Sequence, residues 1–148
     1  MSKIKNLLAG LGGAVALNVL HESLKKKGSD MPRVDLLGEE ALQKSLQYFG
    51  TSIYDQSTLY KATLAGDVFS NALYYSLIGA GSNEHIWTRA ITYGLAAGVG
   101  AITLPKPLGL DPEPVTKSQQ TKVLTVAYYL AGAIVTGCII KAMGKKEE

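Results

Sequence analysis

The chain has 148 residues, with 15 Lys and Arg against 12 Asp and Glu and a formal net charge of +3. This length is typical of one domain. The basic residues are scattered and are not interleaved with aromatic residues, which argues against nucleic-acid binding. The single cysteine, Cys138, excludes an intrachain disulfide, and we expect it to pack as a small hydrophobic residue.

An apolar run rich in Gly and Ala predicts a first membrane helix over residues 4–22. Lys3 and Lys5, followed by an apolar stretch that ends in Ala14-Val15-Ala16, are also typical of a cleaved secretory signal peptide. We favour a retained first helix, because polar positions continue beyond that cleavage point.

The connection over residues 23–59 contains a second kind of helix, at about 34–49. Apolar side chains, among them Phe49, fall on one side of this helix, and charged or amide side chains, among them Glu39, fall on the other. Because the helix is too polar to span a bilayer, we expect it to lie on the membrane surface or to cap the bundle. Asp30 and Asp35 are the candidate N-caps.

Three further apolar segments, at about 60–80, 87–105 and 119–142, predict three more spans, and a proline-rich connection occupies residues 105–115. Each segment is short for a hydrocarbon core of about 30 Å. A soluble four-helix bundle is the alternative. Its helices would carry charges on an outward face, and the central parts of the last two segments carry none.

The sequence therefore predicts one all-α membrane domain over residues 1–148, with four short transmembrane helices and one amphipathic surface helix. We expect an integral membrane protein of the inner or plasma membrane, with the lipid bilayer as its partner. Small residues recur at spacings of four, for example Gly94 with Gly98 and Ala133 with Gly137, which lets helices approach closely. We favour packing within the chain; a homo-oligomer or a partner membrane subunit would use the same faces.

Alternating spans place both long connections on one side of the membrane, so polar groups of three spans share one half of the bilayer. There, an ionisable residue such as Asp67 is a hypothesis for a functional site. For Asp67 we expect a hydrogen-bonding partner among two tyrosines of the last span, Asn18 and, less favourably, His21. Because His21 lies at the end of its span, we otherwise expect it to meet water or headgroups. The candidates for this polar pocket are Asn18, His21, Glu22, Asp67, Asn71, Tyr128 and Tyr129.

No cofactor is expected, because the sequence has no Walker lysine motif, no dinucleotide fingerprint and no pair of histidines at helical spacing. A metal site made of His21, Glu22 and Asp67 is geometrically conceivable, although no motif demands it.

Three classes of function remain open. The first, which the sequence favours, is a packing, accessory or oligomer-forming role, in which the small-residue faces bind a partner subunit or a second copy and the polar groups only hydrogen-bond across helices. The second is a conduit or carrier for protons, ions or small solutes that uses Asp67. The third is an intramembrane enzyme acting on a lipid-like substrate.

Overall fold

The computed structural model describes residues 2–144, and this part of the chain is all-helical, as the sequence predicted. The α-helices are α1 (Lys3–Leu24), α2 (Val34–Tyr48), α3 (Gln56–Ser76), α4 (Ile86–Thr103), α5 (Glu113–Thr116) and α6 (Gln119–Gly144). Two short 3-10 turns, η1 (Leu77–Gly79) and η2 (Asn83–His85), join α3 to α4.

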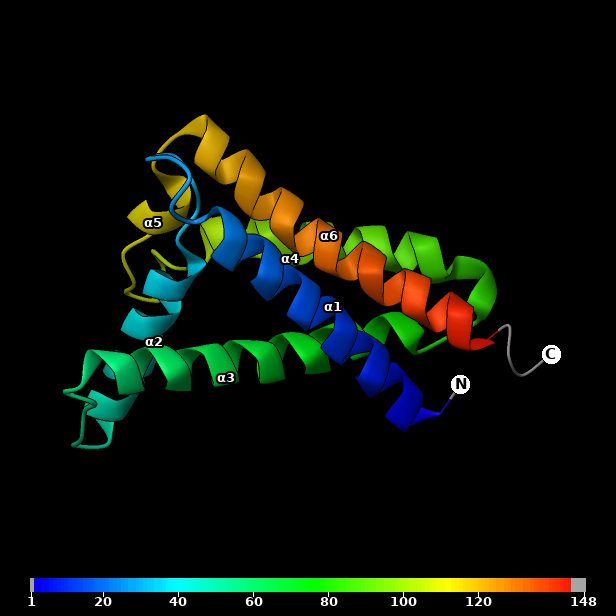
Figure 1. The fold of residues 1–148 in the computed structure, drawn as a ribbon, viewed down its shortest axis with the longest axis horizontal. Coiled ribbons are helices and arrows are strands. Elements are labelled where there is room, and N and C mark those ends of the chain that lie inside the picture. The colour runs from blue at the N-terminus through cyan, green and yellow to red at the C-terminus, as the bar shows by residue number, and fades with distance from the viewer. Residues whose placement is uncertain (1, 145–148) are drawn as a thin grey trace.

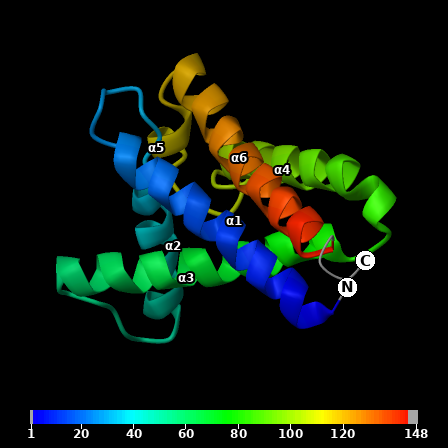
Figure 2. The ribbon, with the colours of Figure 1, turned by 45° about the vertical axis from the view of Figure 1, so that its right-hand side comes forward.

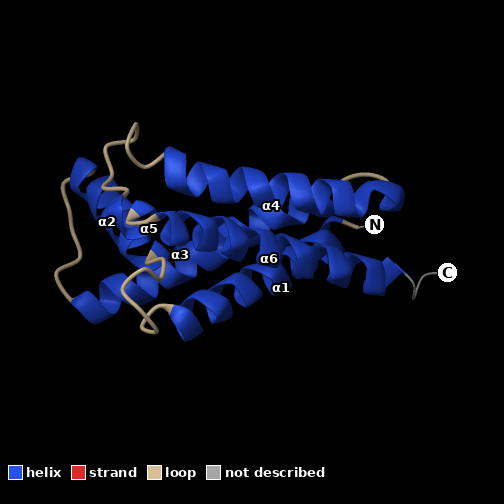
Figure 3. Cartoon of the chain, turned by 90° about the horizontal axis from the view of Figure 1, so that it is seen from above, coloured by secondary structure: helices blue, strands red, loops and turns tan. Residues whose placement is uncertain are grey.

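The four long helices run alternately in opposite directions (Figure 1). α1 packs between α3 and α6, and α4 packs against α6. α1 begins and α6 ends at the same end of the bundle as the short α3–α4 connection, while α2, α5 and the longer connections gather at the other end (Figures 1 and 3). We call this other end the α2 end.

The long helices pack closely because small residues form their contacts. A Cβ atom added to Gly98 of α4 would lie 2.6 Å from the Cα atom of Val126 in α6, so only glycine fits there. Gly10 and Gly13 of α1 approach the backbones of α3 and α6 in the same way. These small-residue faces are therefore filled within the chain, as the sequence favoured.

Tyrosines add specific hydrogen bonds between the helices. The Tyr75 hydroxyl of α3 donates to the Tyr129 carbonyl of α6 over 2.7 Å, and the Tyr74 hydroxyl donates to the Tyr93 carbonyl of α4 over 2.7 Å. Tyr75 is completely buried, so its hydroxyl needs this partner. The bundle core thus combines glycine contacts with tyrosine hydrogen bonds.

Many large apolar side chains of the long helices point outward. Examples are Ile4 at 72% exposure, Phe69 at 66% and Val123 at 65%. Cys138 is also exposed, so the expectation that it packs in the interior is wrong. The interior combines small residues and tyrosines with a few aliphatic side chains, among them Leu17, Ile78 and Ile140, and the exterior of the long helices also carries many aliphatic and aromatic side chains.

Two of the described helices, α1 and α6, are long and apolar enough to cross a membrane by length and composition. A buried helix of a soluble protein, or for α1 a signal sequence, would meet the same criterion. α3 carries Lys61 and Asp67, and α4 has Arg89 in its first turns. The four predicted spans correspond to four observed long helices, but composition identifies only two of them as candidate spans.

The expected orientation of α2 is wrong in part. Glu39, assigned to the outward polar side, is buried, and Phe49, assigned to the apolar side, is exposed just beyond the end of the helix. α1 and α3 diverge toward the α2 end, and α2 occupies the opening between them (Figures 1 and 2). One side of α2 therefore faces polar groups of α1 and α3, and its acidic residues Asp35 and Glu39 are buried on that side.

Candidate functional site

The candidate site lies at the α2 end, where the last turn of α1, the first turn of α2 and the middle of α3 meet. His21 comes from that last turn of α1 and is only 4% exposed. The expectation that it meets water or headgroups is therefore wrong. Asp35 sits in the first turn of α2 and is buried as well. Its side chain caps no backbone group, because the N-cap residue is Arg33.

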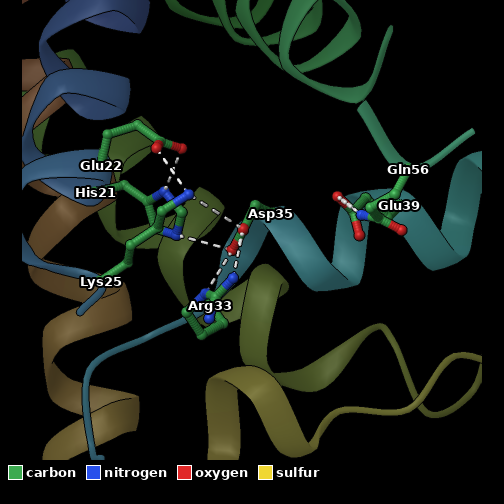
Figure 4. A network of polar contacts seen from close by, with 7 residues as sticks. All are labelled: His21, Glu22, Lys25, Arg33, Asp35, Glu39 and Gln56. Atoms are coloured by element: carbon green, nitrogen blue, oxygen red, sulfur yellow. Dashed lines mark hydrogen bonds and ion pairs between the residues drawn. The ribbon is translucent and has the colours of Figure 1, made fainter. Parts of the chain in front are cut away.

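Asp35 is the centre of an ionic network that joins α1 to α2 (Figure 4). Its carboxylate accepts two hydrogen bonds from Arg33, from Nε over 3.0 Å and from Nη2 over 2.9 Å. The Nε2 atom of His21 lies 3.3 Å from Oδ1 of Asp35, and Nζ of Lys25 lies 3.6 Å from Oδ2. This carboxylate thus faces basic groups from two elements.

Glu22 extends the network on the α1 side. Nζ of Lys25 lies 2.8 Å from Oε2 of Glu22, and Nδ1 of His21 lies 3.5 Å from Oε1. Lys25 also lies over the ring of Tyr60, 4.7 Å from its centroid, which ties the network to α3. The imidazole of His21 is consequently held between two carboxylates.

The surroundings of Asp35 favour its charged form. Burial alone would raise the pKa of this carboxyl, but hydrogen bonding to His21 and Arg33 outweighs burial and holds the pKa far below its usual range. Burial likewise would lower the pKa of Lys25, while Glu22 and Asp35 raise it above its ordinary value. Both groups are therefore ionised at neutral pH.

An enclosed pocket of about 20 Å³ lies beside this network, which is room for one water-sized group. Two buried polar atoms of its lining residues, Asn18 Nδ2 and Thr63 Oγ1, have no hydrogen-bond partner, while His21 Nε2 and Glu22 Oε1 make only the longer contacts to Asp35 and to His21 Nδ1 described above. Buried polar groups normally have partners, so these atoms indicate a place that can accept a further polar group.

A larger cleft of about 520 Å³ opens next to the pocket, between α3 and α4. Small residues of α4, among them Ala96 and Gly100, line one wall, and Tyr129 of α6 contributes to its lining. α2 and the proline-rich connection close it at the α2 end. Val34, Asp67 and Asn71 line both the cleft and the pocket, so the two spaces meet at these residues.

Asp67 stands at this junction. Gly38 of α2 packs directly on it, since a Cβ atom on Gly38 would lie 3.2 Å from Oδ2 of Asp67. No hydrogen bond to the Asp67 carboxylate is seen within residues 2–144, so the expected hydrogen-bonded partner is not found. The carboxylate is instead placed beside both spaces.

The structure brings the seven candidate residues to one region but in different roles. Asn18, His21, Glu22, Asp67 and Asn71 line the pocket, and Tyr129 lines the cleft. Tyr128 lines neither space; its ring meets His21 edge-on, with centroids 6.3 Å apart. Three residues of the ionic network were not among the candidates: Lys25, Arg33 and Asp35. Thr63 was not a candidate either, although helical spacing places it on the same stripe of α3 as Asp67 and Asn71.

Within the described part of the chain, no group of three or more His, Cys, Asp or Glu side chains is arranged to hold a metal ion. The conceivable metal site of His21, Glu22 and Asp67 therefore receives no support. Comparison with protein-family models, with curated proteins and with solved structures gave no match, so an assignment of function rests on the geometry of this site.

Proposed function

We propose that the protein is an integral membrane protein whose four long helices cross the bilayer and whose α3–α4 cleft binds the apolar chain of an amphiphilic ligand. The observation that carries the proposal is the cleft itself: a largely apolar, open space whose only acidic or basic lining residue, among those described, is Asp67. Its volume falls within the usual range of small-ligand sites, about 300–1,000 Å³.

The distribution of side chains supports the membrane location. An apolar outer surface of the long helices is unfavourable in water. In a bilayer the same side chains contact lipid tails, which are as apolar as the core of a soluble bundle. The described parts of α4 beyond Arg89 and of α6 between Lys122 and Lys141 carry no charge. At a rise of about 1.5 Å per residue, even the 18 residues of α4 extend for about 27 Å, close to the hydrocarbon thickness of about 30 Å.

A binding role agrees better with this geometry than the packing role that the sequence favoured. A packing role would leave the small-residue faces free for a partner, but Gly10, Gly13, Gly94 and Gly98 are all covered within the chain. A conduit would need polar groups through the whole bundle. Beyond Asn71, the core is closed by the hydrogen bond from Tyr75 to Tyr129.

The proposal is tested by filling the cleft. Ala96 is an exposed residue of α4 that lines the cleft, so Ala96→Phe occupies it without entering the core. Ala127→Phe is the matched control, because Ala127 is exposed on α6 and does not line the cleft. The purified proteins are reconstituted in vesicles with a photoreactive 12-carbon amphiphile, and labelled peptides are identified by mass spectrometry.

We expect labelling to concentrate on α3 and α4 and to fall at least tenfold in Ala96→Phe, with Ala127→Phe unchanged. Labelling spread evenly over the outward faces of the four helices, or labelling that Ala96→Phe leaves intact, would contradict a ligand site in the cleft.

A further inference from the structure

We infer that the head of the ligand is a small primary ammonium group that enters the enclosed pocket beside Asp67. This inference rests on the proposed binding of an amphiphile in the α3–α4 cleft. It concerns the chemistry of the ligand's polar end, which the cleft alone does not specify. Three observations support it: the charges around the pocket, its volume, and the atoms that it leaves without partners.

The pocket has one carboxylate more than it has permanent cations. Glu22, Asp35 and Asp67 line it. Lys25 is paired with Glu22 at 2.8 Å, and Arg33 is paired with Asp35 at 2.9 Å. Asp67 remains without an ion-pair partner of its own, and isolated charges are costly in a membrane interior. A cationic group at the junction of cleft and pocket would offset that charge.

The remaining basic side chain of the pocket, His21, is already placed between Glu22 and Asp35. Its ring nitrogens lie next to those two carboxylates rather than next to Asp67. Gly38, the α2 residue that packs on Asp67, contributes no side chain that could neutralise it. Within the described residues Asp67 has no ion pair of its own, so either a bound proton or an external cation neutralises it, and the amine-against-alcohol comparison below distinguishes the two.

The size of the pocket restricts the head group. About 20 Å³ accommodates a group of the size of a water molecule, which a primary ammonium matches and a trimethylammonium exceeds. An ammonium offers three donors, and two oxygens can accept from it: Thr63 Oγ1, which has no partner, and Glu22 Oε1, whose contact with His21 Nδ1 is 3.5 Å long. The Asn18 amide, rotated by 180°, offers its oxygen as another acceptor.

Anionic heads are disfavoured by the same arrangement. A phosphate or carboxylate in the junction would face the Asp67 carboxylate at short range. The two cations of the network, Lys25 and Arg33, are engaged with carboxylates on its other side and do not line the pocket. The charge pattern thus selects a donor-rich, positively charged head over a phosphate-bearing one.

The experiment compares four probes with the same 12-carbon chain: dodecylamine, dodecanol, dodecyltrimethylammonium and dodecanoate. Each competes with the photoreactive amphiphile for the full chain in uncharged vesicles. We expect dodecylamine to compete at least tenfold more strongly than the other three. Asp67→Asn should remove the advantage of the amine over the alcohol while leaving dodecanol competition within twofold of the wild type.

Glu40→Gln is the matched control, because Glu40 is a carboxylate of α2 at the same end of the bundle that lines neither space, and glutamine keeps an oxygen for the Asp111 N–H that Glu40 holds. An equal loss of amine preference in Asp67→Asn and Glu40→Gln would attribute the preference to general surface charge and overturn the inference. Equal competition by all four probes, still blocked by Ala96→Phe, would also overturn it while leaving the cleft proposal standing. If no probe competes and the cleft is not labelled, both the proposed binding of an amphiphile in the cleft and the inferred ammonium head are contradicted. The probe series on the wild-type chain decides the matter even if Asp67→Asn fails to fold.

Discussion

At the scale of single residues, Asp35 combines roles that the sequence does not reveal. Its carboxylate joins Arg33 of its own segment to His21 and Lys25 of α1, and it is almost completely buried. The sequence alone identifies Asp35 only as an acidic residue at the start of an amphipathic helix. Its importance comes from what α1 places opposite it.

Replacing this carboxylate should destabilise the fold. Asp35→Asn leaves His21, Lys25 and Arg33 without their shared anionic partner, so we expect the free energy of unfolding to fall by about 2 kcal/mol or more. We place the value below that of a fully buried pair because Arg33 is partly exposed. Glu40→Gln breaks a more exposed pair with Lys44 and keeps a side-chain oxygen that can accept from the Asp111 N–H, so it should cost less than about 1 kcal/mol.

The effect should depend on pH in one direction. The pKa of Asp35 is lower in the folded protein than in the unfolded chain, so its contribution is fully present above the ordinary aspartate pKa of about 3.9. As the pH falls below that value, the unfolded chain takes up a proton first and the contribution is lost. Unfolding in detergent, followed from pH 7 to pH 3, should show wild type and Asp35→Asn converging only at the acid end. A stability difference that is absent at pH 7 would contradict this role of Asp35.

At the scale of elements, glycine decides how close α4 and α6 lie. Gly98 faces the backbone of Val126, whereas Gly66 of α3 faces open space. Gly98→Ala should therefore destabilise the fold by about 1–3 kcal/mol through overpacking. Gly66→Ala should stabilise α3 by about 0.5–1 kcal/mol through helix propensity. Thermal unfolding of the two variants in the same detergent checks the pair. Similar shifts in the same direction would show that the α4–α6 contact does not depend on Gly98.

The sequence predicts the existence of the long helices better than it predicts the orientation of α2. The four long helices follow from four apolar runs, and one-turn spacing placed Asn18, Asp67 and Asn71 on faces that meet in one pocket. The sequence pattern of α2 did not predict which side of this helix faces the bundle. Its pattern assigns Glu39 to solvent, but Gln56 at the start of α3 donates a hydrogen bond to Glu39 over 3.1 Å. That contact depends on how far α1 and α3 diverge, which periodicity within one helix cannot specify.

At the scale of the whole molecule, the alternating order of spans correctly predicts that both long connections and the polar candidates lie at one end. What it could not predict is the cleft. Its walls come from α3 and α4, its lining includes Tyr129 of α6, and its closed end comes from α2 and the proline-rich connection. Such a space arises from the relative placement of five segments, and the sequence contains only their separate patterns.

The proposed function requires that α3 and α4, the two long helices that composition does not identify as spans, lie in the bilayer. The most direct measurement is the collision of a spin label with oxygen, which concentrates in hydrocarbon, and with a water-soluble nickel chelate. In a Cys138→Ser background, single cysteines for spin labelling replace the outward-facing residues Phe69 of α3 and Val99 of α4. The control label replaces Tyr54, which is exposed in the α2–α3 connection. We expect the labels at 69 and 99 to collide mainly with oxygen and the label at 54 mainly with the nickel chelate. If the labels at 69 and 99 behave like the label at 54, then α3 and α4 lie in water, and the membrane cleft does not exist.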